Sequence, residues 1–264
     1  MRNVRIDDYD AIARPFVAIG NDYPTGHFLP NHAHRRAQLL YGATGVMQVA
    51  AQGGAWVVPP QRAVWIPPGV IHQVRMMGVS TRSLYIEPLA VPGLGDACQV
   101  VEVSPLLRQL LLAVVDMPAA YAVTGREGAL AALLLFELAR LEPVPLHIPL
   151  PQDARLAALC RNFLALPDVH ASPVSWAGHL HMSARTFSRF FRSQTTMSFS
   201  DWRQRACVVL ALSRLGQGDA VTTIALDFGY ESPGAFSTMF RRVLGSTPTS
   251  YLQLDVGAPG TYSR

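Results

Sequence analysis

The feature that most constrains this chain is an internal repeat in its C-terminal half. "SARTFSRFFR" (183–192) can be placed over "SPGAFSTMFR" (232–241) at an offset of 49 residues, 232 minus 183. In each copy a serine is followed four and eight residues later by phenylalanines, which therefore share one helix face. Each copy predicts an amphipathic helix that begins after a serine N-cap. The matched pairs are Ser183 with Ser232, Phe187 with Phe236, Ser188 with Ser237, Phe191 with Phe240, and Arg192 with Arg241.

The segments around each copy predict a helix-turn-helix. Short helices are expected in "PVSWAGHL" (173–180) and "VTTIALDF" (221–228), followed by tight turns at 181–183 and 229–232. In that arrangement the second, capped helix enters the major groove of DNA. "FSDWRQRACVVLALSRL" (199–215) is expected to join the two units as a helix of about 15 residues, roughly 23 Å at 1.5 Å per residue. Such a rod can place two reading helices in successive major grooves, about 34 Å apart.

The two expected reading helices differ on their outward faces. The first carries guanidinium groups, which can bond guanine, whereas the second is small and neutral and favours phosphate, methyl or shape contacts. For any single arginine the alternative is a solvated helix face with no DNA role. The candidate DNA-binding residues are Ser183, Ala184, Arg185, Ser188, Arg189, Arg192, Ser232, Pro233, Gly234, Ala235, Ser237, Thr238 and Arg241.

The distribution of charge agrees with a nucleic-acid partner for the C-terminal half. The chain has a net charge of +4 and no lysine. Residues 1–149 hold 11 Arg and 11 Asp or Glu, whereas residues 150–264 hold 11 Arg and 7 Asp or Glu. The whole positive excess therefore lies in the half that contains the repeat, as an anionic partner requires.

The first hundred residues predict β-structure instead. Residues 39–74 mix short apolar runs with Gly and Pro at about ten-residue spacing, which is typical of an all-β barrel or sandwich. Two helices are expected after Ser104, in "SPLLRQLLLAVVDM" and "REGALAALLLFELARL". Both are apolar over most of their surface, so they pack against the barrel or form a dimer seam. "EPVPLHIPLPQD" (142–153), with four prolines, predicts an inter-domain linker.

"PNHAHRRAQ" (30–38) places two histidines two residues apart. On a strand, His32 and His34 point to the same side, as they would on one wall of a metal site. Phe28 and the pocket candidates Tyr41, Trp56 and Trp65 could line an effector pocket in the barrel mouth; the alternative is that each packs in the core.

The C-terminal half resembles the AraC/XylS family of bacterial transcription regulators. The resemblance lies in "MSARTFSRFFR", "FSDWRQR", "IALDFGYESPGAFSTMFRR" and "GSTPTSY", which cover about residues 170–251. It implies two helix-turn-helix units joined by one long helix and binding DNA from one chain. His181 and Thr196 stand where the family usually has glycine, so a left-handed backbone there would be strained. Cys207, Leu210 and Leu252 stand at positions that are often arginine, which implies fewer contacts to the DNA backbone.

The N-terminal half resembles the cupin sensor of many members of that family. Gly26, His32, His34 and Gly45 have the spacing of the first cupin motif, with Gln38 where a glutamate is usual, and Pro67, Gly69 and His72 give the second motif. The resemblance implies a divalent Mn, Fe, Ni or Zn ion on His32, His34, Gln38 and His72. The missing carboxylate weakens affinity for a hard cation. The alternative is that the histidines form hydrogen bonds inside a barrel that binds an organic effector, or nothing.

These observations predict an α+β chain: a cupin-like sensor domain (1–100), a helical connector with a Pro-rich linker (101–149), an AraC-type DNA-binding domain (150–254) and a flexible tail (255–264). The predicted function is a sequence-specific transcription regulator that senses a small molecule or metal. The alternative is a cupin metalloenzyme, a dioxygenase or isomerase, with a helical appendage. We expect no enzyme activity, because no Ser/His/Asp set, P-loop or dinucleotide fingerprint is present.

The expected partners are double-stranded DNA and the effector, with a homodimer left open and RNA polymerase added if the protein activates transcription. No run is long and apolar enough to cross a membrane. "MRNVRIDDYD" has no apolar signal region, and Cys98, Cys160 and Cys207 form no closely spaced pair. We therefore expect a cytoplasmic protein without membrane contact.

Overall fold

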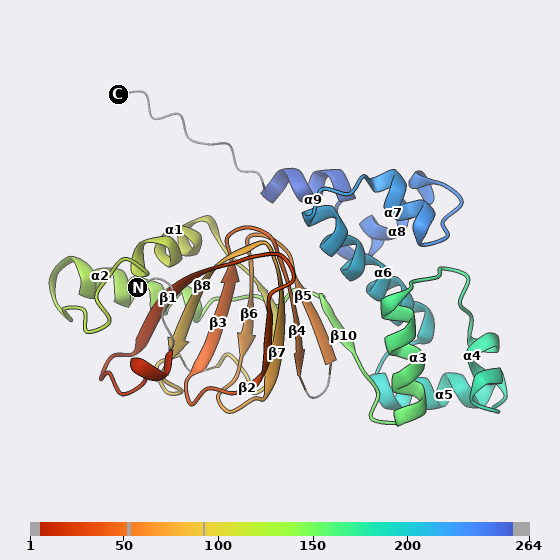
Figure 1. Ribbon diagram of the computed structural model, residues 1–264, viewed down its shortest axis with the longest axis horizontal. Helices are drawn as coiled ribbons and strands as arrows, with labels where there is room; N and C mark the ends of the chain where they lie inside the picture. The colour runs from red at the N-terminus through yellow and green to blue at the C-terminus, as the bar shows by residue number, and fades with distance from the viewer. Residues whose placement is uncertain (1–5, 52–53, 92, 256–264) are drawn as a thin grey trace. The chain divides into compact units, whose positions relative to one another are not determined.

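The computed structural model describes residues 6–51, 54–91 and 93–255. The chain forms two compact units, Met1–His147 and Ile148–Arg264 (Figure 1). Apart from Asp255, the predicted tail (255–264) lies outside the described residues. Within those residues, no helix combines the length and apolarity that crossing a membrane requires.

The described residues up to Pro149 form two five-stranded sheets, and every strand pairing with a described register is antiparallel. A short 3-10 helix, η1 (Ile6–Asp8), precedes them. In spatial order the first sheet contains β1 (Phe16–Tyr23), β8 (Val79–Ile86), β3 (Ala37–Gly42), β6 (Arg62–Ile66) and β9 (Gln99–Glu102). The second contains β10 (His147–Pro149), β5 (Gly54–Val58), β4 (Val46–Ala51), β7 (His72–Met77) and β2 (Phe28–His32). The predicted β-fold of this half is confirmed.

Side-chain alternation decides which face of each sheet is inside. Along β7, His72, Val74 and Met76 are buried, while Arg75 is exposed. Directly opposed residues of antiparallel strands share a face, so Trp56 of β5, which lies in line with Val49 and Val74, is also on the inner face. The inner faces of the two sheets therefore supply the barrel interior.

One motif glycine is required by close packing. Gly45 has a φ of +68°, and a Cβ on it would lie 2.2 Å from the carbonyl oxygen of Gly78. Only glycine fits both the left-handed backbone and that approach. The turn before β4 is therefore fixed by the sequence.

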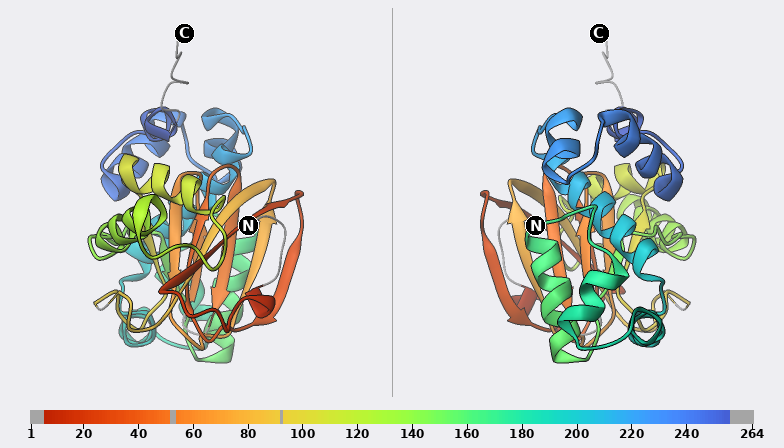
Figure 2. Two further views of the ribbon diagram at one scale, coloured as in Figure 1. Left: turned by 90° about the vertical axis from the view of Figure 1, so that its left-hand side faces the viewer. Right: turned by 90° about the vertical axis from the view of Figure 1, so that its right-hand side faces the viewer.

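Helices α1 (Pro105–Val114) and α2 (Gly125–Leu138) cover the outer face of the first sheet (Figures 1 and 2). The Ser104 side chain caps α1 by accepting from the Leu107 N–H, as predicted. Both helices belong to the first unit, so the segment expected as a connector packs on the barrel. Within the expected linker, residues 147–149 form β10 at the edge of the second sheet.

The C-terminal unit is helical and contains the predicted repeat. Its helices are α3 (Ala154–Ala165), α4 (Pro173–His179), α5 (Ala184–Thr195), α6 (Phe199–Gly216), α7 (Val221–Asp227), α8 (Pro233–Leu244) and α9 (Pro248–Asp255). The pairs α4–α5 and α7–α8 are the two helix-turn-helix units, and α6 joins them. The caps hold as predicted: Ser183 accepts from the Thr186 N–H and Ser232 from the Ala235 N–H.

Candidate functional site

Three histidines from the two sequence motifs meet inside the barrel. The ligand nitrogens of His32, His34 and His72 all lie within 4.8 Å of one another. His32 faces His72 across the β2–β7 pairing, and their ring centroids are 4.2 Å apart. The Gly69 N–H donates to the His34 carbonyl at 2.8 Å, so the turn of the second motif is fastened to the first. Two ligands at about 2.0–2.1 Å from one ion are at most about 4 Å apart, close to this separation.

Backbone carbonyls set which nitrogen of two histidines carries the proton. The Nδ1 atoms of His32 and His72 lie 2.7 Å and 2.9 Å from the carbonyl oxygens of Pro30 and Val70. A carbonyl can only accept, so each Nδ1 donates and each Nε2 keeps its lone pair. This is the arrangement in which a second partner orients a metal-binding imidazole.

Two ring nitrogens of the cluster and one side-chain oxygen of β3 are buried without a hydrogen-bond partner among the described residues. His34 Nε2, His72 Nε2 and Gln38 Oε1 are buried and have no hydrogen-bond partner in the described protein. Gln38 is oriented because its Nε2 donates to the hydroxyls of Ser83, at 3.3 Å, and Tyr85, at 3.2 Å. Buried acceptors left unpaired are costly, so this donor set fits a cation that would accept their lone pairs.

Burial keeps the imidazoles of His34 and His72 neutral. It lowers the pKa of His34 to about 4, helped by the neighbouring His32 and His72. Burial also lowers the pKa of His72, although the Val70 carbonyl partly opposes this. Neutral imidazole is the form that binds a metal.

Two arginines directly after the histidine pair hold the N-terminal segment. The Arg36 side chain is fully buried and pairs with Asp10 and Glu87 at 3.2 Å and 2.9 Å. Arg35 pairs with the same two carboxylates. Hydrogen bonds from Arg35 lower the pKa values of Asp10 and Glu87. The two guanidiniums and the two carboxylates balance in charge.

The predicted pocket aromatics separate onto different faces. Trp56 lies on the inner face and stacks on His147 at 4.7 Å. Tyr41 and Trp65 lie instead in the core that joins the first sheet to α1 and α2, and Trp65 Nε1 donates to the Gly95 carbonyl. Odd-numbered residues of β3 face the helices, whereas Gln38 faces inward, so Tyr41 does not line the barrel mouth. Phe28 is 45% exposed, beneath the Arg75 guanidinium.

The outward face of α5 is basic. Arg185, Arg189 and Arg192 are exposed and make no ion pair with a described residue, while Phe187 and Phe191 are buried below them. Ser188 is exposed and Ala184 half-buried. Hollows of about 680 Å³ and 340 Å³ lie along this row. Their walls add residues that the sequence analysis missed: Thr186, Phe190 and Ser193 in the larger, and Pro173, Ser198, Phe199 and Ser200 in the smaller.

The outward face of α8 is mostly small and neutral. Gly234, Ala235 and Thr238 are exposed, and Pro233 and Ser237 are half-buried. Its exposed cations are Arg241 and Arg242 near the C-terminus, and Arg242 donates to the Gln204 side chain. The contrast between the two helices on which the DNA prediction rests is therefore present in the fold.

Left-handed turns occur where the sequence lacks family glycines. His181 has a φ of +57° and Thr196 a φ of +61°, so the strained conformation expected at both positions is observed. Cys207 is fully buried in α6, and burial raises the pKa of its thiol to about 11. A position buried in this way is not available for a DNA contact in this chain.

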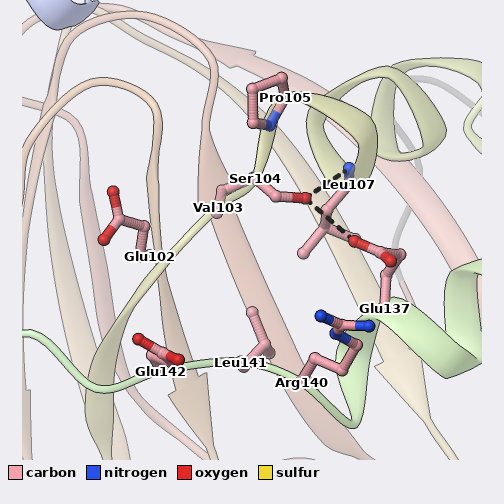
Figure 3. A pocket seen from close by; sticks show the side chains of 9 residues that line it. All are labelled: Glu102, Val103, Ser104, Pro105, Leu107, Glu137, Arg140, Leu141 and Glu142. Atoms are coloured by element: carbon pink, nitrogen blue, oxygen red, sulfur yellow. Dashed lines mark hydrogen bonds between the residues drawn. The ribbon is translucent and has the colours of Figure 1, made fainter.

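A third hollow, of about 470 Å³, lies between the end of β9, the start of α1 and the end of α2 (Figure 3). Its charged lining consists of Glu102, Glu137, Glu142 and Arg140. Ser104 donates to Glu137 at 3.0 Å while capping α1. This bond gives Glu137 a structural role.

Family models match both halves of the chain. The model described as "AraC-like ligand binding domain" matches residues 15–173, and the one described as "Helix-turn-helix domain" matches residues 176–254. Together they agree with the resemblance of each half of the sequence.

Named relatives are regulators. The chain is 33% identical over 224 residues to "HTH-type transcriptional regulator NimR" of Escherichia coli (strain K12), covering 84% of this chain and 82% of that protein. It is 30% identical over 114 residues to "HTH-type transcriptional regulator RipA" of Corynebacterium glutamicum, covering 42% and 34%. Among solved structures, the DNA-binding domain of AdpA in complex with a target DNA is 33% identical, covering 39% of this chain and 93% of that chain, with a TM-score of 0.36.

These matches decide between the two functions that the sequence left open. The relatives are named as transcription regulators, which argues against the cupin metalloenzyme. The predicted regulator and its two kinds of domain are confirmed. The chain belongs to the AraC family of transcription regulators, with a ligand-binding N-terminal domain and a helix-turn-helix DNA-binding domain.

Proposed function

We propose that this regulator binds specific DNA sequences through α5 and α8 and that its N-terminal barrel detects a divalent transition metal at the histidine cluster. The observation that carries the sensing role is the convergence of His32, His34 and His72, with His34 Nε2 and His72 Nε2 buried and unpartnered within the described chain. Gln38 Oε1 on β3 is likewise buried and unpartnered. A regulator that binds DNA acts where the DNA lies, so the cytoplasm is the proposed location. RNA polymerase is a further partner where the protein activates transcription.

The two reading helices divide the DNA contacts between them. Exposed guanidiniums on α5 suit bidentate bonds to guanine, so Arg185 and Arg189 select sequence. The small neutral face of α8 allows close approach, so its contacts are to phosphate, methyl groups and DNA shape. The N-capped starts of both helices favour phosphate.

Mapping bound DNA across the source genome, followed by binding titrations on one mapped site, tests this assignment. Arg185→Ala should weaken binding to that site by about 1–3 kcal/mol at fixed salt, because a bidentate base contact is lost. Arg161→Ala, which removes an equal charge from the exposed surface of α3, is the matched control. Equal effects of the two variants would show that Arg185 acts only through net charge.

The metal site is supported by its donors. His32, His34 and His72 supply three neutral imidazoles, and Gln38 supplies an amide oxygen. Imidazole suits Fe, Ni and Zn, whereas Mn prefers oxygen ligands such as the Gln38 amide, and affinity rises from Mn through Fe to Ni. A bound ion would satisfy the orphaned lone pairs and link β2, β3 and β7 across the barrel interior.

Elemental analysis of the purified full-length protein, together with melting curves in the presence and absence of each ion, tests the metal. Near-stoichiometric metal and a melting temperature that rises with the ion are expected, because a ligand of the folded state stabilises it. His72→Ala should remove both effects. His147→Ala, outside the trio, is the matched control. Metal below about a tenth of an equivalent, with no melting shift, would exclude the site.

The outward side of α2 supports a homodimer. Its inner side packs on the barrel through Ala131, Leu134 and Leu138, yet Leu133 and Phe136 remain 41% and 72% exposed. A helix that is apolar on both sides is stabilised by a second partner. A second copy of this chain would also double the DNA contact. Phe136→Ser should convert a dimer to a monomer in sedimentation, whereas Leu166→Ser, at an equally exposed leucine of the other unit, should not.

A further inference from the structure

The donor set at the histidine cluster carries no negative charge. His32, His34 and His72 bind a metal only as neutral imidazoles, through ring nitrogens that lie within 4.8 Å of one another. Gln38 offers only an amide oxygen, because its nitrogen donates to Ser83 and Tyr85. A divalent ion on these four groups therefore keeps its full charge of two.

The carboxylates near the cluster do not supply the missing charge. Asp10 and Glu87 are already paired with Arg35 and the buried Arg36, two against two. Asp7 lies on η1 and is exposed to solvent, which screens its charge. An ion in this site would keep an uncompensated charge beside the buried His72. Such a charge is stable in a protein interior only when it is paired.

We propose that an anionic small molecule, a carboxylate that binds the metal through oxygen, completes this site, so that the barrel detects the metal and the carboxylate together. The proposal rests on the proposed function, since it requires a metal on the histidines. His32 and His34 are only half-buried, so an approach to the site exists on their side. Gln38 has the shape of a glutamate without its charge. A glutamate at this position would neutralise part of the charge of the metal, whereas with glutamine an external anion must do so.

Cobalt(II) binding to the full-length protein tests the proposal. Cobalt reports its ligands by visible absorption, and glycolate and glycolamide form a probe pair that differs in charge but hardly in shape. Glycolate should tighten cobalt binding by about tenfold, within the usual range for two coupled ligands, and should change the absorption bands. Glycolamide should do neither. His72→Ala provides the correction for cobalt bound by glycolate in solution.

A second variant places the charge inside the protein. Gln38→Glu should bind cobalt more tightly than the natural chain without glycolate, and the gain from glycolate should fall below about twofold, because the two anions then compete for one role. If this variant does not fold, the glycolate and glycolamide pair on the natural chain decides alone.

The outcomes separate the two proposals. Failure of the natural chain to bind cobalt with or without glycolate overturns both the metal site and the anion. Tight cobalt binding that glycolate and glycolamide affect equally overturns the anion alone and leaves the metal site standing. An undiminished glycolate effect in folded Gln38→Glu also overturns the anion, since charge at this position would then be irrelevant.

Discussion

The two helix-turn-helix units share one plan and differ in how that plan is supported. In the first unit Phe187 and Phe191 of α5 join an aromatic cluster with Trp176, Phe199 and Trp202. In the second, the phenylalanines of α8 meet only two further aromatic rings, those of Tyr230 and Tyr251, among the described residues.

The turns of the first unit are more strained than those of the second, whereas the short helix of the first unit is better capped. The first unit has left-handed His181 and Thr196, whereas the second has Gly229 and Gly245. The first short helix has a capping box at Ser172, whereas the second begins after Ala220 without a side-chain cap. The comparison teaches that the first unit offsets strained turns with a larger aromatic core and a capped first helix, and that its α5 carries three exposed arginines.

The largest expected effect concerns the aromatic cores beneath α5 and α8. Phe191→Ala and Phe240→Ala each remove a fully buried ring and should each cost about 3–5 kcal/mol of the free energy of unfolding. The loss should be greater for Phe191, because its ring contacts more aromatic neighbours. Urea unfolding of the full chain, followed by tryptophan fluorescence, measures both. A greater loss for Phe240 would reverse the assignment of the stronger core.

The next effect concerns DNA binding by the outward faces of α5 and α8. Arg189→Ala should weaken specific binding by about 1–3 kcal/mol and relax the sequence preference at one base pair. Arg241→Ala should weaken binding to all sequences alike and reduce the salt slope by about one, as expected for a phosphate contact. Titrations on matched and single-mismatch duplexes at several salt concentrations distinguish them. An identical pattern for both variants would contradict a division of labour.

The third effect concerns the left-handed residues that follow α5 and α8. Thr196→Gly should stabilise the folded protein by about 1 kcal/mol, because the relief of left-handed backbone strain outweighs the entropy that glycine adds to the unfolded chain. The reciprocal Gly245→Ala should destabilise it by about 1–2 kcal/mol through backbone alone, since a Cβ there meets nothing within 4 Å. Thermal unfolding measures both. Stabilisation by both changes would mean that φ is not the cause.

The smallest effect concerns the caps. Ala220→Ser should add a side-chain acceptor at the start of α7 and stabilise the protein by about 0.5–1 kcal/mol. Ser172→Ala should cost about 1 kcal/mol, because it breaks the capping box of α4. The two variants are compared by the urea concentrations at which half of the protein is unfolded, and an unchanged m-value shows that the difference is one of stability. No gain from Ala220→Ser would indicate that the backbone N–H groups at the start of α7 are already hydrogen-bonded to water.

Much of the fold follows from local pattern. The serine caps, the aromatic spacing and the long joining helix were predictable because each depends on residues within one or two helical turns. The motif glycines and histidines were likewise predictable from spacing. The pocket aromatics were not, because face assignment depends on which side of a sheet the helices cover. Tyr41 and Trp65 look like barrel-mouth residues in the sequence and pack against α1 and α2 in the fold.

The sequence by itself determined that this chain carries two unequal helix-turn-helix units, because the repeat, its caps and its arginines are all local in the chain. Only the tertiary structure decided that His32, His34 and His72 converge and that Gln38 is held by Ser83 and Tyr85 with its oxygen left unpaired. It also decided that the neighbouring carboxylates are already matched by Arg35 and Arg36. The reason is physical: the charge balance of a buried site is a sum over groups that the chain brings together from distant strands.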